Sequence, residues 1–135
     1  RSCDEGTAIS EKAAIKATNA NTLWNLHKGG NQQFQLINDP ATGNYTMYNA
    51  STRRNLDANG AVAKNNTNVS IWSGNSSCAQ KWKLTSVGND HYRISSACNT
   101  GFSLDAAGGV AHAGTNVLLW ANHNGNNQKW KFTKI

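Results

Sequence analysis

Tryptophan recurs along this chain at a fixed interval, and that interval constrains the fold more than any other feature. Trp24, Trp72 and Trp120 lie 48 residues apart. Ten residues after each of them comes a second aromatic residue, namely Phe34, Trp82 and Trp130. Because both sets share one period, the pattern indicates three copies of one structural unit. The copies divide the 135-residue chain into repeats of about 1–40, 41–88 and 89–135, which we expect to form a single domain.

Each second aromatic belongs to a Gln-x-aromatic motif, and two of the copies carry an acidic residue upstream. The glutamines are Gln32, Gln80 and Gln128. Asp57 and Asp105 each precede the first tryptophan of their repeat by 15 residues, whereas Ser10 occupies the corresponding position in the first repeat. The three copies have therefore diverged unequally at one polar position.

Each unit is expected to contain four short strands joined by polar turns. In the third unit these strands are predicted near residues 92–95, 103–105, 117–120 and 129–132, and the second unit opens with one at 45–49. The segment 10–18 contains good helix formers, but the repeat alignment predicts strand and turn there. The chain is therefore expected to be all-β.

The strands after the glutamines alternate lysine with apolar residues, which places one face toward a core. Trp82, Leu84, Trp130 and Phe132 are predicted to point inward and the lysines outward. One unit cannot bury its apolar face alone, whereas three units that close on a common axis share one core. Three copies are too few for a β-propeller, which has four or more blades.

Charge and composition argue against several classes of function. The chain has 13 Lys and Arg against 7 Asp and Glu, but the basic residues are dispersed along the strands, so we expect no nucleic-acid partner. No apolar run is long enough to span a bilayer, so no membrane insertion is expected. The four histidines lack metal-ligand spacing, and His112 and His123 could approach the polar positions of the third repeat but are expected at turns. No nucleophile motif or phosphate loop is present.

The three cysteines leave the redox compartment open. One disulfide and one spare thiol would fit a secreted module, and three thiols would fit a cytosolic one. Cys78 and Cys98 flank a hairpin-sized segment and could form a bridge, whereas Cys3 has no obvious partner. The chain opens with Arg1, which we interpret as a sign of a processed chain or an excised domain.

Nearly the whole chain resembles the ricin-type (R-type) β-trefoil lectin and carbohydrate-binding module family with Gln-x-Trp repeats. The resemblance rests on the threefold Gln-x-aromatic motif, the upstream tryptophan and the earlier aspartate. It implies an all-β β-trefoil with up to three shallow sugar sites, one per repeat, and with no cofactor. In this family the aspartate accepts hydrogen bonds from two sugar hydroxyls and the aromatic stacks on the ring. The asparagine before the glutamine binds a hydroxyl, and the glutamine supports the aspartate.

Carried onto this chain, the resemblance predicts sites of unequal quality. The third repeat is complete, with Asp105, Trp120, Asn127 and Gln128, and with Leu118 in place of a frequent polar contact. The second repeat keeps Asp57, Trp72 and Gln80 but has Ala79 at the asparagine position, and Asn75 is the candidate to replace that contact. The first keeps Trp24, Asn31 and Gln32 but has Ser10 at the acidic position, so we expect it to be silent. The predicted order is third, second, first.

The resulting hypothesis is a secreted, non-catalytic module that binds galactose- or xylose-type units of glycans or polysaccharides, mainly through the third repeat. A linked catalytic or toxin domain is the expected context, with the chain as its targeting module. Asp57 and Asp105 belong to different repeats, which argues against the close carboxylate pair of a glycosidase. The alternatives are a protein-binding trefoil, such as a protease inhibitor or a receptor-binding toxin domain, and a binder of acidic partners.

Overall fold

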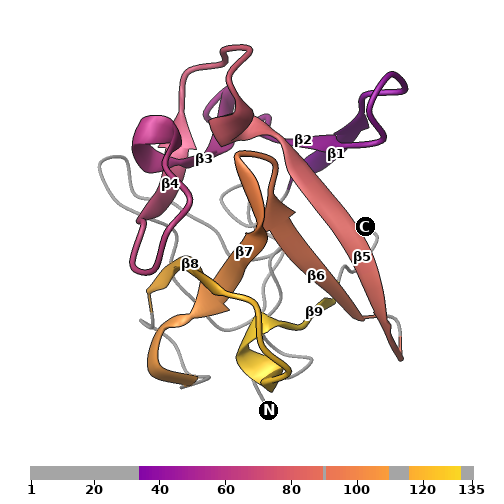
Figure 1. Cartoon of the computed structure of the whole chain (residues 1–135). Coiled ribbons are helices and arrows are strands. Elements are labelled where there is room, and N and C mark those ends of the chain that lie inside the picture. Colours follow the sequence, from indigo (N-terminus) through magenta and orange to yellow (C-terminus); the bar gives the residue numbers. More distant parts are fainter. Residues whose placement is uncertain (1–33, 90, 110–115, 132–135) are drawn as a thin grey trace.

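The computed structural model describes residues 34–89, 91–109 and 116–131, which form antiparallel strands joined by short turns (Figure 1). The strands are β1 (Gln35–Asn38), β2 (Tyr45–Asn49), β3 (Arg54–Ala58), β4 (Val69–Trp72), β5 (Trp82–Gly88), β6 (His91–Ser96), β7 (Asn99–Ala106), β8 (Val117–Ala121) and β9 (Trp130–Lys131). Single 3-10 turns lie between them: η3 (Asn59–Ala61), η4 (Cys78–Gln80), η5 (Ala107–Gly109) and η6 (Asn126–Gln128). The expected all-β architecture is confirmed for these residues.

The strands pair into one continuous sheet. Its main path runs β4-β3-β2-β5-β6-β7-β8, with β1 added beside β2 and β9 beside β6. The long β5 and β6 strands run side by side across the molecule (Figure 1). The strands predicted for the third repeat correspond to β6, β7, β8 and β9, and the one at 45–49 is β2, so these predictions are confirmed.

The second and third repeats use the same register at the hairpins that follow the acidic residues. Asp57 on β3 lies opposite Ser70 on β4, and Asp105 on β7 lies opposite Leu118 on β8. Each of these strand pairs leads from the acidic residue into a 3-10 turn, η3 or η5. Equivalent backbones therefore hold the two carboxylates in equivalent places.

The core includes two of the tryptophans that the alternation predicted to face inward. Trp82 and Trp130 are fully buried, and each indole Nε1–H donates to a backbone carbonyl oxygen, that of Leu56 at 3.2 Å and that of Leu104 at 3.1 Å. Lys83 is exposed and Leu84 packs against the core, as expected. Because Leu56 and Leu104 directly precede the two aspartates, the buried tryptophans also fix the strands that carry the carboxylates.

A disulfide joins Cys78 and Cys98, which are separated by 20 residues. It ties η4 to the turn between β6 and β7. The sequence did not decide whether these two cysteines are bridged, and the structure contains the bridge.

Several predictions concern residues outside the described ranges. These are the inward position of Phe132, the turn position of His112, the segment 10–18, Cys3, and the first-repeat residues Ser10, Trp24, Asn31 and Gln32. Within the described ranges, no helix is long and apolar enough to cross a membrane.

Candidate functional site

Two pockets lie at equivalent places in the second and third repeats. The second-repeat pocket, of about 480 Å³, is lined by Asp57, Asn59, Gly60, Ala61, Trp72, Asn75, Ser77 and Ala79. The third-repeat pocket, of about 300 Å³, is lined by Asn66, Asp105, Ala107, Gly108, Leu118, Trp120, His123 and Asn127. The structure thus gathers the predicted site residues of each repeat around one carboxylate.

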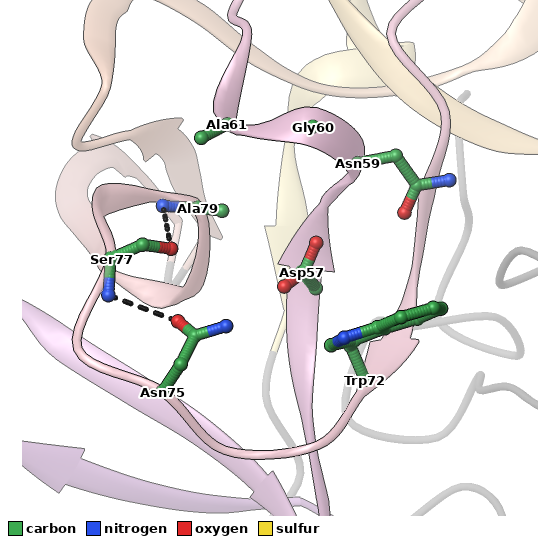
Figure 2. A pocket seen from close by; sticks show the side chains of 8 residues that line it. All are labelled: Asp57, Asn59, Gly60, Ala61, Trp72, Asn75, Ser77 and Ala79. Atoms are coloured by element: carbon green, nitrogen blue, oxygen red, sulfur yellow. Dashed lines mark hydrogen bonds between the residues drawn. The ribbon is translucent and has the colours of Figure 1, made fainter.

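The backbone explains how each pocket forms. The carboxylate comes from the end of β3 or β7, and the tryptophan comes from the adjacent strand β4 or β8. The chain then turns over the pocket at Gly60 or Gly108, whose φ angles of 76° and 70° are left-handed values that glycine adopts without steric cost. Figure 2 shows the second-repeat pocket, with Asp57 between Trp72 on one side and Asn75 on the other.

The predicted glutamines lie beneath the pockets and hold them together. Gln80 is fully buried, and its Nε2 donates to Asp57 Oδ2 at 2.9 Å and to the Ser73 carbonyl at 2.8 Å. Its Oε1 accepts from the Asn75 backbone N–H and the Asn55 side chain, both at 2.9 Å. All of its hydrogen-bonding atoms are therefore used inside the protein, so it orients the carboxylate and leaves the ligand to other groups.

Gln128 repeats this arrangement in the third repeat. Its Nε2 donates to Asp105 Oδ2 at 2.9 Å and to the Ala121 carbonyl at 3.0 Å. Its Oε1 accepts from the backbone N–H of His123 at 3.0 Å. The same frame thus supports both carboxylates.

The third-repeat carboxylate has two further side-chain partners. Asn127 Nδ2 donates to Asp105 Oδ1 at 2.9 Å and to the Ala106 carbonyl at 3.1 Å. His123 Nε2 lies 3.3 Å from Asp105 Oδ2, and His123 Nδ1 accepts from the Gly125 N–H at 2.8 Å. Since Nδ1 is an acceptor, the neutral ring carries its hydrogen on Nε2 and donates to the carboxylate. The sequence predicted a turn position for His123, and the structure places the residue in the pocket as well.

The second-repeat carboxylate, Asp57, accepts fewer side-chain hydrogen bonds from the described residues than Asp105 does. Among the described residues, Gln80 supplies the hydrogen bond to Asp57, through Oδ2. Ala79 stands where the third repeat has Asn127, so it offers no side-chain donor. The Asn75 side-chain oxygen accepts from the Ser77 N–H at 2.9 Å, and its amide nitrogen points toward Asp57 (Figure 2). A carboxylate has about four acceptor positions, so Asp57 retains more capacity for an incoming ligand than Asp105 does.

The two pocket tryptophans differ sharply from the two core tryptophans. Trp72 is 58% exposed and Trp120 is 37% exposed, whereas Trp82 and Trp130 are 0% exposed. A large exposed indole beside a nearly buried carboxylate offers an apolar face next to a polar anchor. This pairing suits a ligand that has both an apolar face and hydroxyl groups.

The structure also adds residues that sequence reasoning missed. Asn59 lines the second-repeat pocket, and its Oδ1 accepts from the Ser70 hydroxyl at 2.6 Å. Asn66 belongs to the second repeat by sequence, yet it lines the third-repeat pocket. Comparing the copies with one another could not reveal Asn66, because that comparison assigns each site to one repeat.

Each pocket contains a single carboxylate among its described lining residues. Across residues 34–89, 91–109 and 116–131, no three His, Cys, Asp or Glu side chains gather closely enough to hold a metal ion. Each pocket therefore offers one carboxylate and one indole face, beside amide, hydroxyl or imidazole side chains, among its described lining residues.

Comparison with known proteins gave a family model and several similar structures. The model described as ricin-type β-trefoil lectin domain-like matches residues 2–72, 30–120 and 78–135. A comparison with curated protein sequences gave no match.

Three solved structures illustrate the likeness. The designed 3-fold symmetric protein ThreeFoil has a TM-score of 0.87 at 24% identity, over 99% of this chain and 95% of that one. The Macrolepiota procera ricin B-like lectin, solved with lactose, has a TM-score of 0.75 at 23% identity, over 96% and 88%. An exo-β-1,3-galactanase from Clostridium thermocellum has a TM-score of 0.82 at 23% identity; the match covers 90% of this chain and only 26% of the enzyme chain. At these identities the likeness is one of fold.

Proposed function

This chain belongs to the ricin-type β-trefoil lectin domain-like family, and from that premise we propose that it binds carbohydrate without transforming it. Its fold is the all-β trefoil that the three repeats predict. The observation that carries the proposal is the pairing, found twice, of a nearly buried aspartate with an exposed tryptophan in one pocket.

The geometry suggests how a sugar is held. A carboxylate accepts hydrogen bonds from two adjacent hydroxyls, and the indole packs against the C–H face of the pyranose ring. Each pocket would thus bind two adjacent sugar hydroxyls through Asp57 or Asp105. The indole of Trp72 or Trp120 would pack against the face of the sugar ring. Among the described lining residues, one carboxylate per pocket supplies no acid and base pair of the kind that glycoside hydrolysis uses.

We assign the stronger binding to the third-repeat pocket. Gln128, Asn127 and His123 all donate to Asp105, so the carboxylate is fixed before the ligand arrives. A fixed group loses less conformational freedom on binding, which favours affinity. The second-repeat pocket has greater free acceptor capacity at Asp57 but a less rigid anchor, and we rank it second.

The sugar is proposed to be of galactose or xylose type. The family resemblance suggests these units, and two structures of similar fold point to galactosides: a lectin solved with lactose and an exo-β-1,3-galactanase. Because the match covers about a quarter of that enzyme chain, a targeting role beside a catalytic or toxin domain is part of the proposal. The Cys78–Cys98 disulfide supports secretion, since such bonds persist in oxidising compartments.

Calorimetric titration with lactose and xylobiose tests the proposal, after a glycan array has confirmed the class. Asp105→Asn should weaken binding at the third-repeat pocket by about tenfold or more, because hydrogen bonds to a charged acceptor are worth about 1.5–3 kcal/mol. Asp57→Asn should do the same at the second-repeat pocket. Asp39→Asn, in the turn between β1 and β2 and away from both pockets, is the matched control. Full sugar binding by the Asp57→Asn/Asp105→Asn double variant would contradict the proposal.

A further inference from the structure

One position beside each carboxylate is occupied by a different side chain in the two repeats. His123 follows Asn75 by 48 residues, so the two residues hold equivalent places in the third and second repeats. The Asn75 backbone N–H donates to Gln80 Oε1 at 2.9 Å. The His123 backbone N–H donates to Gln128 Oε1 at 3.0 Å. The chain therefore enters both pockets in the same way, tied to the buried glutamine beneath each of them.

The two side chains also accept the same hydrogen bond from their own turn. Asn75 Oδ1 accepts from the Ser77 N–H at 2.9 Å. His123 Nδ1 accepts from the Gly125 N–H at 2.8 Å. In each case the donor lies two residues further along the chain, so an amide oxygen in one repeat and a ring nitrogen in the other do the same structural work.

The nitrogen that remains in each side chain faces the carboxylate. Asn75 Nδ2 points toward Asp57 (Figure 2). His123 Nε2 lies 3.3 Å from Asp105 Oδ2, and the His123 side chain is 41% exposed, so solvent protons can reach it. An amide does not titrate, whereas an imidazole is the side chain whose charge changes between about pH 5 and pH 8. Among the described lining residues, the third-repeat pocket alone thus places a group that can gain positive charge beside its carboxylate.

Protonation of His123 changes the hydrogen bonding at both ring nitrogens. The added proton sits on Nδ1, where the Gly125 N–H already points, so two donors face each other and that hydrogen bond is lost. At Nε2 the ring becomes a charged partner of Asp105 and offsets the negative charge that sugar hydroxyls would bind. Because hydrogen bonds to a charged acceptor are roughly twice as strong as neutral ones, this weakens the hold on a sugar.

The loss of the Gly125 hydrogen bond reaches the other donors to the carboxylate. A Cβ built on Gly125 would lie 2.7 Å from Asn127 Oδ1 and 2.7 Å from His123 Cε1, so this turn is packed against both side chains. The Gly125 carbonyl also accepts from the Gln128 N–H at 3.2 Å. A shift of the turn therefore disturbs Asn127 and Gln128, which both donate to Asp105.

The charged and titratable groups around His123 are few. Among the described lining residues of the third-repeat pocket, Asp105 is the other titratable group. The rest of that lining is uncharged and comes from the segment between η3 and β4, from η5, from β8 and from η6: Asn66, Ala107, Gly108, Leu118, Trp120 and Asn127. The described lining of the second-repeat pocket has Asp57 as its titratable group. The second pocket thus records what a carboxylate without an imidazole does over the same pH range.

We propose that His123 is a positioning residue that makes sugar binding at the third-repeat pocket weaken as the pH falls from about 7.5 to about 5. The second-repeat pocket, with Asn75 at the equivalent position, keeps its affinity over this range. The inference rests on the proposed function and adds to it a pH dependence that distinguishes the two pockets.

An exchange of the two residues tests this. His123→Asn gives the third-repeat pocket the side chain of the second, and an asparagine there can accept from the Gly125 N–H as Asn75 does from Ser77. Asn75→His is the reciprocal change. His91→Asn is the matched control, because His91 lies on β6 and lines neither pocket.

The readout is an NMR titration of the whole chain with lactose and with xylobiose, at about pH 7.5 and at about pH 5. The Gly108 amide reports on the third-repeat pocket and the Gly60 amide on the second. In the wild type, affinity at Gly108 should be about threefold to tenfold lower at the lower pH, the difference between a hydrogen bond to a charged acceptor and one to a neutral acceptor. Affinity at Gly60 should not change.

The variants should separate the imidazole from every other effect of pH. His123→Asn should bind equally well at Gly108 at both pH values. Asn75→His should acquire a loss of affinity at Gly60 at the lower pH. His91→Asn should behave as the wild type does at both amides.

Four results would overturn the inference and leave the proposed function intact. One is an affinity at Gly108 that stays constant or rises as the pH falls. Another is an equal fall at Gly60 and Gly108 in the wild type, which would assign the effect to the carboxylates. The third is a fall at Gly108 that persists in His123→Asn, and the fourth is an Asn75→His variant whose Gly60 affinity ignores pH. If neither glycine amide responds to either sugar at either pH in the wild type, the proposed function fails, and this inference fails with it.

Discussion

The second- and third-repeat pockets share a frame and differ in the groups that the frame presents. Both keep an aspartate, an exposed tryptophan and a buried glutamine at positions 48 residues apart. The buried frame is nearly identical, down to the indole N–H bonds from Trp82 and Trp130. The buried frame, the aspartate and the exposed tryptophan are therefore common to both repeats, while other residues around the two pockets differ.

The divergence is concentrated on two sides of each carboxylate. On one side, Asn127 of the third repeat corresponds to Ala79 of the second. On the other side, Leu118 lies opposite Asp105, where the second repeat has Ser70 opposite Asp57. The third-repeat pocket thus fixes its carboxylate tightly and is lined by the apolar Leu118, whereas the second leaves its carboxylate freer and has the polar Asn59 and Asn75 in its lining. We expect the two pockets to prefer different ligands.

The largest expected effect tests whether the frame is shared. Trp82→Ala and Trp130→Ala should each reduce the free energy of unfolding by about 3–5 kcal/mol, because each empties a fully buried indole volume and leaves a backbone carbonyl without its donor. Urea denaturation followed by tryptophan fluorescence measures this. Costs that differ by more than about 2 kcal/mol between the two variants would break the equivalence of the frames.

The next effect concerns the disulfide that links the second repeat to the third. The Cys78–Cys98 bridge ties η4, which carries Ala79 and Gln80, to the turn between β6 and β7. Replacing both cysteines with serine should lower stability by about 3 kcal/mol, since the bridge closes a loop spanning 20 residues. In a sugar titration followed by NMR, the Gly60 amide should report a larger loss of affinity at the second-repeat pocket than the Gly108 amide reports at the third. Equal losses at both amides would show that the bridge acts on the whole fold.

The supporting glutamines should differ in importance. Gln80→Ala leaves the nearly buried Asp57 carboxylate without a side-chain donor from the described residues, whereas Gln128→Ala leaves Asp105 with Asn127 and His123. We expect Gln80→Ala to cost about 2–3 kcal/mol and Gln128→Ala about 1 kcal/mol less. Thermal and urea unfolding of the two variants give the comparison. A larger cost for Gln128→Ala would contradict the assignment of partners.

The smallest effect exchanges one residue between the pockets. Ala79→Asn should raise sugar affinity at the second-repeat pocket about threefold, and Asn127→Ala should lower it by a similar factor at the third, because each changes one neutral hydrogen-bonding group. The Gly60 and Gly108 amide shifts separate the two sites. No change in either variant would mean that the asparagine position does not distinguish the pockets.

Much of this account could be predicted from the sequence because the copies can be compared with one another. The repeats predicted the strands, the alternation of lysine with apolar residues predicted the inward tryptophans, and the family resemblance implied the pairing of each glutamine with an aspartate. These features lie within one repeat, so a sequence pattern within that repeat is enough to predict them.

Contacts between repeats and contacts made through turns were not predictable in this way. Asn66 reaches the third-repeat pocket from the second repeat, and no pattern within one copy indicates that. His123 lies in the loop between β8 and η6; the sequence raised its approach to the third site but favoured a turn, because that approach depends on the ring orientation set by the Gly125 N–H. The sequence also left it undecided whether Cys78 and Cys98 are bridged, because cysteine spacing allows a disulfide without requiring one.

The most direct test of the central claim is one titration of the isotope-labelled wild-type chain with lactose, repeated on Asp57→Asn and on Asp105→Asn. The claim is that two separate pockets each bind sugar through one carboxylate. We predict that Gly60 and Gly108 both respond in the wild type, that Asp57→Asn lowers the affinity reported by Gly60 alone by about tenfold or more, and that Asp105→Asn does the same for Gly108 alone. Affinities that neither substitution changes, or that fall at both amides with either one, would contradict it.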